Sequence, residues 1–288
     1  MEYSPVKRSF EPLVVTDLLV YPIKSLGGMS VSAALVGDRG FEYDRRWMLI
    51  DESNRFVTQR EFPEMALLKA SIANDILSVR DSRDGASIQI PLSSPSGSAL
   101  QVNIWDDQCS ALLVEGESTQ WFSKRMGRPL RLVYMPDASH RLVDKDYANQ
   151  GEITGFSDGF PILIIGQSSL DDLNCRLEKP VPMDRFRPNI VFSGGDAFEE
   201  DSFRVFRIGD VRLQAVKPCA RCVLTTTDQE TAQRSAEPLK TLAGFRKANN
   251  KIYFGQNLLA ESRGWIRVND QLIVEQKQDP LFQNNSQS

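Results

Sequence analysis

Two cysteines three positions apart are the residues whose type and spacing most directly suggest chemistry. Cys219 and Cys222 lie in the segment KPCARCVLTTTD. A structural zinc site usually takes two such pairs, but Cys109 and Cys175 are isolated from each other. A thioredoxin-like pair would open a helix, whereas the β-branched residues after Cys222 favour a strand. Two alternatives stay open: one working thiolate, favoured by the charge of Arg221 and suited to a soft metal, or two buried structural thiols.

Basic side chains beside expected strand ends form a second group of candidates. Lys24 and Ser25 follow an expected strand and precede two glycines in YPIKSLGG. Arg45 precedes a strand in YDRRWML, and Arg187 and Asn189 accompany another in MDRFRPNIVF. Lysine and arginine next to loops that expose backbone N–H groups suit a phosphate. Each cluster alone could equally be a solvated loop.

A polar turn is the third candidate. Ser157, Asp158 and Gly159 precede an apolar run in GFSDGFPILII. Such a turn can offer backbone donors to a ligand, or it can simply reverse the chain before a buried strand.

Composition excludes several classes of function. The 34 Lys and Arg against 38 Asp and Glu give a net charge of −4, so we expect no nucleic-acid partner. His140 is the single histidine, which excludes a multi-histidine metal site within one chain, and its polar surroundings predict a surface residue. The first residues lack the apolar segment of a signal peptide, and no apolar run is long enough for a bilayer. We therefore expect a cytoplasmic protein, without a membrane partner, whose four cysteines are reduced.

Short strand-like segments separated by turn residues predict a mainly β fold with a few helices. The expected strands are residues 13–21, 47–51, 55–59, 76–80, 87–90, 100–105, 110–116, 161–165, 189–192, 203–216, 222–227 and 265–276. Hairpin turns are expected in IGDVRL and VNDQLIV. Helices are expected at residues 118–127, 168–180 and 235–247.

Taken together, the motifs resemble the MOSC family, which includes the C-terminal domain of molybdenum cofactor sulfurases. The resemblance is strongest to two-part members with an N-terminal β-barrel module, among them amidoxime-reducing proteins and bacterial reductases of N-hydroxylated bases. The motifs that carry it, in family order, are VYPIKSLGG, DRRWMLID, FSDGFPILI, RFRPNIV, GDVRL, CARCVLTTTD, EPLKTL and FGQNL. The resemblance implies two β-barrel-like modules, residues 12–133 and 134–276, and we expect a flexible tail at 277–288.

The family implies a molybdenum cofactor, a pyranopterin whose dithiolene binds the metal and whose tail ends in phosphate. Cys222 matches the family's metal ligand and is the catalytic candidate. The expected cofactor-binding residues are Lys24, Ser25, Arg45, Asp158, Gly159, Arg187, Asn189 and Arg221, the last of which could instead favour the thiolate. Phe160 departs from animal members, which have a serine at that position.

The activity implied is reduction of N-hydroxylated compounds (amidoximes, hydroxylamines and N-hydroxylated bases) to amines. No plant-type C-x4-C-x2-C run follows Cys222 in this sequence. We therefore expect electrons from a separate protein, ferredoxin-like or flavin-reductase-like, or else a natural chain that continues into an iron–sulfur domain. Pyridoxal phosphate is not expected, because the desulfurase half of the sulfurases has no counterpart here. The alternative is a non-catalytic module that carries or delivers the molybdenum cofactor or its sulfur.

Overall fold

The computed structural model describes residues 11–92, 97–148 and 151–282. Within these ranges the chain is mainly β-structure with three helices, which confirms the predicted fold class. The helices are α1 (Ser118–Met126), α2 (Gln167–Cys175) and α3 (Leu239–Ala243). Four 3-10 helices are η1 (Pro63–Leu67), η2 (Met183–Arg185), η3 (Glu199–Ser202) and η4 (Val223–Thr226). No helix of this described part is long and apolar enough to cross a bilayer.

The largest sheet has nine strands and wraps around one hydrophobic core. In spatial order they are β2 (Met29–Val31), β1 (Val14–Val20), β15 (Ile190–Ser193), β14 (Ile162–Gly166), β19 (Lys251–Ala260), β17 (Val211–Arg221), β16 (Phe203–Ile208) and β21 (Leu272–Lys277), with β18 (Lys247–Ala248) beside β19. Strand β14 is apolar and buried throughout, as expected for a central strand, and it pairs parallel with β15. Phe203 and Phe206 are fully buried in this core, and each contributes roughly 2–3 kcal/mol by its burial.

The two ends of the large sheet approach each other. Val14 on β1 makes an isolated bridge to Gln271, just before edge strand β21, and the N–H of Leu272 donates to the carbonyl of Leu13 at 2.8 Å. Val15 adds two backbone hydrogen bonds, donating to Asp270 at 3.0 Å and accepting from Asn269 at 2.8 Å, but β1 and β21 form no continuous ladder. Within the described residues the predicted barrel-like character is therefore a curled half-barrel, not a closed barrel.

Four smaller sheets complete the β-structure. Their strands are β5 (Trp47–Ile50), β11 (Arg131–Tyr134), β10 (Asp107–Leu113) and β9 (Ala99–Ile104); β6 (Leu68–Ala73), β7 (Ile76–Asp81) and β8 (Ser87–Pro91); β20 (Gly264–Arg267), β3 (Ala33–Gly37) and β4 (Gly40–Phe41); and β12 (Arg141–Leu142) with β13 (Ile153–Thr154). Strand β8 alternates exposed and buried residues, so one face of its sheet meets a core while the other faces solvent.

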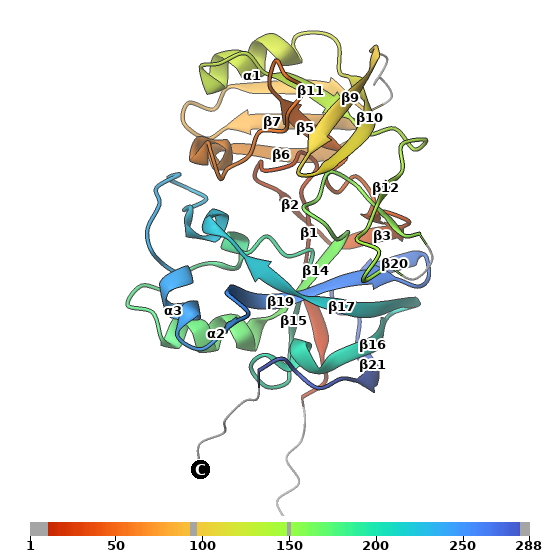
Figure 1. The fold of residues 1–288 in the computed structure, drawn as a ribbon, viewed down its shortest axis with the longest axis vertical. Coiled ribbons are helices and arrows are strands. Elements are labelled where there is room, and N and C mark those ends of the chain that lie inside the picture. Colours follow the sequence, from red (N-terminus) through yellow and green to blue (C-terminus); the bar gives the residue numbers. More distant parts are fainter. Residues whose placement is uncertain (1–10, 93–96, 149–150, 283–288) are drawn as a thin grey trace, which may run out of the picture.

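Figure 1 shows these elements in two tiers. The upper tier holds α1 with β5 to β7 and β9 to β11, and the lower tier holds α2 and α3 with the curled large sheet. The first described strands belong to the lower tier, because β1 pairs with β15 of the large sheet and β3 pairs with β20. Strands from the two predicted modules therefore share sheets, and the boundary at 133/134 stays a prediction. Residues 283–288 of the expected flexible tail lie outside the described residues.

Three sequence expectations were wrong. Residues 55–59 form only isolated bridges, Arg55 to Asn103 and Phe56 to Ile50, because the chain turns into η1 directly afterwards. The expected hairpin in VNDQLIV does not form, because β20 pairs with β3 and β21 pairs with β16. The hairpin expected in IGDVRL is confirmed between β16 and β17.

The third wrong expectation concerns residues 222–227, which form η4 rather than a strand. The hydroxyl of Thr225 donates to the carbonyl of Cys222 at 3.0 Å, and that of Thr226 donates to the carbonyl of Val223 at 2.7 Å. These local bonds compete with strand pairing, as threonine side chains can. Cys222 therefore follows the end of strand β17 instead of opening a strand.

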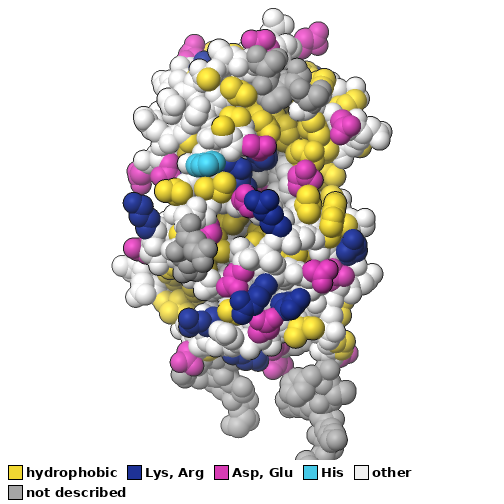
Figure 2. Space-filling model, turned by 90° about the vertical axis from the view of Figure 1, so that its right-hand side faces the viewer, with side chains coloured by type: hydrophobic (Ala, Val, Ile, Leu, Met, Phe, Trp, Pro, Cys, Tyr) yellow, Lys and Arg dark blue, Asp and Glu magenta, His cyan; other side chains and the backbone are white. Residues whose placement is uncertain are grey.

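The helices begin near the predicted positions but two are shorter. Helix α1 ends at Met126 and is capped by Gly127, whose φ of 65° suits a glycine after a helix end. Helix α2 ends at Cys175 instead of residue 180, and α3 covers only the middle of the segment expected at 235–247. His140 is exposed, as predicted. Figure 2 shows acidic and basic side chains intermixed over the face that it draws.

Candidate active site

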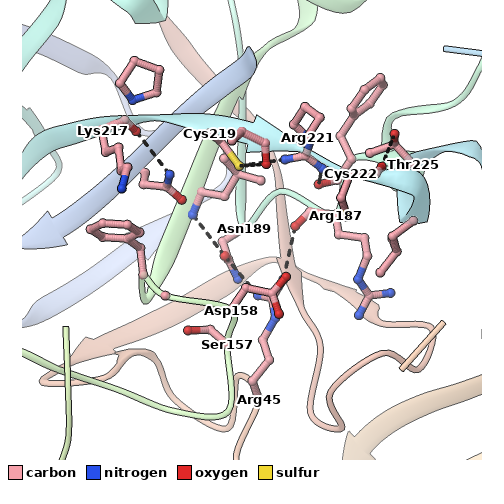
Figure 3. A pocket seen from close by; sticks show the side chains of 18 of the residues that line it. Arg45, Ser157, Asp158, Arg187, Asn189, Lys217, Cys219, Arg221, Cys222 and Thr225 are labelled. Atoms are coloured by element: carbon pink, nitrogen blue, oxygen red, sulfur yellow. Dashed lines mark hydrogen bonds between the residues drawn. The ribbon is translucent and has the colours of Figure 1, made fainter. Parts of the chain in front are cut away.

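One cavity of about 290 Å³ collects every candidate residue that the sequence singled out. Its lining includes Lys24, Ser25, Arg45, Asp158, Gly159, Arg187, Asn189, Arg221 and Cys222. In Figure 3 strand β17, with Lys217, Cys219 and Arg221, passes above the cavity, while Ser157, Asp158 and Arg45 lie on the opposite side. Segments separated by up to about two hundred positions along the chain therefore meet at one place.

Three of the lining residues have left-handed backbone conformations. The φ angles of Ser25, Arg45 and Arg187 are 68°, 50° and 54°. Each such conformation costs a non-glycine residue on the order of 1 kcal/mol, and such residues gather at functional sites. The strain here turns three polar or charged side chains into the same cavity.

The loop that carries Asp158 is held from behind by one arginine. The Arg141 guanidinium donates to the carbonyls of Gly155, Ser157 and Asp158 at 3.1, 2.7 and 3.2 Å. The Asp158 carboxylate can therefore face the cavity, where its Oδ1 lies 2.5 Å from Lys24 Nζ and its Oδ2 lies 2.7 Å from Arg60 Nη2. Burial alone would raise its pKa, but the charges of Lys24 and Arg60 hold the pKa well below its usual range.

Lys24 is a buried cation at the base of the cavity. Burial lowers its pKa to about 8, although the carboxylate of Asp158 partly opposes this shift. The ammonium group also lies 5.5 Å from the centre of the Phe56 ring. A lysine in this setting loses its charge at a pH more than two units lower than an exposed lysine does.

Arg45 and Asn189 join two segments of the chain that line the cavity. Arg45 Nη1 contacts Asp44 and donates to Asn189 Oδ1, and Nη2 donates to the carbonyl of Arg187 at 3.3 Å. The Asn189 amide donates to the carbonyl of Leu19 at 3.1 Å. The side chain of Asn189 thus uses both its donor and its acceptor within the protein, while still lining the cavity.

Arg187 has an unusual environment for a guanidinium group. Its side chain is buried and stacks on the Tyr21 ring at 4.2 Å, and among the described residues no hydrogen bond or ion pair is recorded for its guanidinium. Burial lowers its pKa to about 10. Because buried charges are normally paired, the buried Arg187 guanidinium is suited to bind an anion in the cavity.

The balance of charge in the cavity also favours an anion. Seven cations line it, namely Lys24, Arg45, Arg60, Arg187, Lys217, Arg221 and Lys251, and the lining contains one carboxylate, that of Asp158. The chain as a whole carries a net charge of −4. A strongly positive cavity in a slightly acidic protein favours a phosphate or another compact anion.

The two cysteines meet different arginines. Cys222 Sγ accepts a hydrogen bond from Arg60 Nε at 3.1 Å, whereas Cys219 Sγ accepts one from Arg221 Nη1 at 2.9 Å. Arg221 also donates to the carbonyl of Phe186 at 2.6 Å, so its recorded hydrogen bonds do not include Cys222. Along extended backbone the two cysteine Cα atoms lie roughly 10 Å apart, beyond the reach of about 7 Å for a disulfide. The geometry separates the pair into two single thiols, both free.

Comparison with known proteins identifies the chain. Residues 13–129 match the model of the MOSC N-terminal beta barrel domain, and residues 152–273 match that of the MOSC domain. The chain belongs to the MOSC family. It is 34% identical over 284 residues to the human (Homo sapiens) mitochondrial amidoxime-reducing component 1, which covers 90% of this chain and 82% of that protein. It is 32% identical to the tomato (Solanum lycopersicum) molybdenum cofactor sulfurase, over 90% of this chain but 35% of the sulfurase.

A solved structure also resembles the chain at low identity. The crystal structure of the YUAD protein from Bacillus subtilis matches with a TM-score of 0.40 and 11% identity, over 90% of this chain and 94% of that one. This likeness is too distant to carry an argument, so family membership rests on the sequence matches.

The cavity draws on both MOSC segments. Lys24, Ser25, Arg45 and Arg60 come from the segment matched to the N-terminal domain, and Asp158, Arg187, Asn189, Arg221 and Cys222 come from the MOSC domain. A molybdenum cofactor fits the residues present. The Arg187 guanidinium without a partner among the described residues, the excess of cations and the free Cys222 thiol suit a group that brings a phosphate and its own sulfur ligands. The described residues contain no cluster of three or more His, Cys, Asp or Glu side chains that could hold a metal ion.

Sequence reasoning missed Arg60 altogether. It lies in the segment RFVTQRE, directly after the residues assigned to a strand that the structure does not form. Its two partners, Cys222 and Asp158, lie 162 and 98 positions away along the chain, so no local spacing could indicate the contact. Lys217 and Lys251 also line the cavity without having been assigned to it.

Proposed function

We propose that the chain binds a molybdenum cofactor in this cavity and reduces N-hydroxylated compounds, such as amidoximes, hydroxylamines and N-hydroxylated bases, to amines. The observation that carries the proposal is the free thiol of Cys222, which lines a strongly cationic cavity together with Cys219 and accepts a hydrogen bond from Arg60. The 34% identity to an amidoxime-reducing component supports the reaction class.

Most of the predicted site residues have a proposed task. Cys222 Sγ binds the metal. Lys24, Ser25, Arg45 and Arg187 bind the phosphate and pterin. Lys24, Ser25 and Arg187 are buried donors that line the cavity, and Arg45 is a partly buried donor with a left-handed backbone. The remaining cofactor-binding candidates are Asp158, Gly159, Asn189 and Arg221: Asn189 orients Arg45, and Arg221 contributes charge beside Cys219.

When bound, the cofactor supplies an open coordination position and two electrons for cleaving the N–O bond. The overall change consumes two electrons and two protons, turns R–NHOH into R–NH2 and releases water. The chain's own residues hold the cofactor, keep Cys222 oriented and surround the anionic parts with positive charge. A separate ferredoxin-like or flavin-reductase-like protein supplies the electrons in this proposal. We place the protein in the cytoplasm on sequence grounds alone; the curated relatives include mitochondrial proteins.

The test compares wild type with Cys222→Ala and with the matched control Cys219→Ala. Each protein is produced under conditions replete in the cofactor, its molybdenum is measured by mass spectrometry, and benzamidoxime reduction is followed with a chemical reductant. We expect wild type and Cys219→Ala to contain metal and to form benzamidine, and Cys222→Ala to lose reduction. Wild type without molybdenum, or full activity in Cys222→Ala, would defeat the proposal.

A second candidate is a non-catalytic module that carries or delivers the cofactor or its sulfur. The similarity to molybdenum cofactor sulfurase favours it, although this chain spans about a third of that protein. This candidate predicts transfer of the cofactor to an apo-acceptor enzyme, with N-hydroxyl reduction at background even with a competent electron donor.

A further inference from the structure

We infer that Arg60 is a positioning residue that holds the Cys222 sulfur through an N–H···S hydrogen bond and thereby sets the reduction potential of the metal. This inference rests on the proposed function and deepens it. Arg60 Nε lies 3.1 Å from Cys222 Sγ, and Arg60 Nη2 lies 2.7 Å from Asp158 Oδ2. The planar guanidinium is thus held through two of its nitrogens by groups from two separate segments of the chain.

A third contact supports the face of the same guanidinium. It stacks over the Trp105 ring at 4.2 Å, and Trp105 packs edge-on against Phe56 at 4.6 Å between ring centres. Trp105 lies at the turn between β9 and β10, with a φ of 54°, and it is a large hydrophobic residue that stays partly exposed. A left-handed tryptophan at a hairpin turn is unfavourable in itself. In this conformation the Trp105 ring supports one face of the Arg60 guanidinium.

The backbone at Arg60 is also tied to the segment that follows Cys222. The buried side chains of Gln59 and Gln229 donate to each other at 3.3 and 3.1 Å. Arg234 Nη2 donates to the carbonyl of Arg60 at 2.8 Å, and Arg234 Nε donates to Thr227 Oγ1 at 3.3 Å. The loop with Arg60 and the loop after Cys222 are therefore held together independently of the arginine–sulfur contact. These hydrogen bonds place Arg60 beside Cys222 whether or not the arginine–sulfur hydrogen bond forms.

The consequence follows from the chemistry of metal-bound sulfur. A hydrogen bond to a thiolate withdraws electron density from the sulfur, so the metal receives less and is reduced more easily. Arginine suits this task because its planar fork can address the sulfur and the carboxylate at once. A lysine keeps the charge but presents one point donor and cannot reproduce both directions. In this inference the effect on the metal depends on the directions of the Arg60 donors as well as on its charge.

The experiment compares wild type with Arg60→Lys and Arg60→Gln, all loaded with cofactor. Arg55→Lys is the matched control, because Arg55 is exposed, pairs with Glu61 and does not line the cavity. Three quantities are measured: molybdenum per protein, the midpoint potential of the metal by EPR-monitored redox titration, and kcat and KM for benzamidoxime. For Arg60→Lys we expect metal content within about twofold of wild type, a more negative potential and kcat lowered about tenfold with KM unchanged. Arg60→Gln should shift the potential in the same direction, and Arg55→Lys should match wild type.

Each other outcome overturns the inference. Wild-type potential and kcat in Arg60→Lys would show that the N–H···S contact has no functional effect. Loss of molybdenum in both Arg60 variants, with unchanged melting temperature, would make Arg60 a cofactor-binding residue instead. If the Arg60 variants fail to fold, Trp105→Leu serves, because it removes the stack and leaves Arg60 intact; an unchanged potential there defeats the inference. If wild type holds molybdenum and reduces benzamidoxime and the variants behave in the same way, only this inference is wrong. If wild type contains no molybdenum, the proposed function is wrong.

Discussion

Lys24 Nζ and Asp158 Oδ1 lie 2.5 Å apart and join the MOSC N-terminal domain to the MOSC domain across the cavity. The lysine is almost fully buried, whereas about half of the carboxylate side chain stays accessible from the cavity. Burial lowers the pKa of Lys24 to about 8, and the nearby Arg60 and Arg141 oppose its charge as well. A cation that titrates near neutral pH therefore lies where we propose that an anion binds.

Cofactor retention should consequently weaken between pH 7 and pH 9. With a pKa of about 8, roughly nine in ten Lys24 side chains are charged at pH 7 and roughly one in ten at pH 9. A bound phosphate favours the charged form, so the midpoint of the loss lies at or above pH 8. Lys24→Arg should keep its charge and remove this dependence. The measurement is molybdenum retained after dialysis at pH 7, 8 and 9; parallel losses in wild type and Lys24→Arg would exclude Lys24 as the cause.

The sequence predicted residues that line one cavity, but it did not predict the contacts between them. Lys24, Arg45 and Arg187 could be found because they stand beside strand ends in ordered motifs, and strand ends converge where sheets meet. Arg60 could not be found, because its relation to Cys222 depends on the pairing of Gln59 with Gln229, 170 positions apart. Side-chain partners across such separations follow from tertiary packing, which no local pattern encodes.

The same limit applies to the fold. Alternation of apolar residues predicted the regular strands, such as β7 and β8, well. It missed β19 (Lys251–Ala260), whose sequence KIYFGQNLLA contains a glycine and polar residues that interrupt the pattern. Gly255 on this strand has a φ of 80°, and an added Cβ would lie 2.8 Å from the carbonyl oxygen of Ile164. A strand interrupted in this way is stabilised by its neighbours β14 and β17 rather than by its own propensity.

Gly159→Ala should lower cofactor content without lowering stability. In the protein itself a Cβ on Gly159 would meet nothing within 4 Å, and the backbone there is not left-handed, so the methyl group would occupy cavity space. We expect an unchanged melting temperature and reduced molybdenum per protein. Gly127→Ala should show the opposite pattern: it loses roughly 1 kcal/mol because φ is 65°, yet keeps its metal, since Gly127 is not among the residues lining the cavity. Equal metal content in wild type and Gly159→Ala would show that the cofactor does not approach this turn.

Glu200 should make stability fall as pH rises toward neutrality. Burial, followed by the charge of Asp201, raises the pKa of Glu200 to about 7, against a usual value of 4.5. The folded state therefore binds more protons than the unfolded state between these values, so this contribution is complete below about pH 4.5 and is lost as pH rises through 7. It amounts to about 3 kcal/mol.

The check is urea denaturation at pH 5 and pH 8. Glu200→Gln carries no titrating group and should reduce the difference between the two pH values. Glu199→Gln is the control, because Glu199 is only partly buried and pairs with Lys277 at 3.5 Å. The idea fails if Glu200→Gln keeps the whole wild-type difference.

Arg246→Met should destabilise the lower tier strongly. Arg246 and Asp201 form an ion pair at 2.5 Å with both side chains almost completely buried, and Gln256 Nε2 donates to the other oxygen of Asp201 at 2.8 Å. Removing the arginine leaves a buried carboxylate without its counter-charge, which costs about 3–5 kcal/mol of the free energy of unfolding. The control is Arg263→Met, because Arg263 pairs with Asp38 on the surface and such exposed pairs contribute less than about 1 kcal/mol.

The double variant Arg246→Met with Asp201→Leu separates loss of charge balance from loss of packing. Without the carboxylate no uncompensated charge remains, so part of the lost stability should return. Full recovery is not expected, since Gln256 Nε2 then loses its acceptor and the Arg246 contacts with the Phe198 and Phe282 rings are not fully replaced. Urea denaturation of the four proteins in this cycle measures the coupling directly. A double variant no more stable than Arg246→Met would show that packing around the guanidinium, and not its charge, maintains this part of the fold.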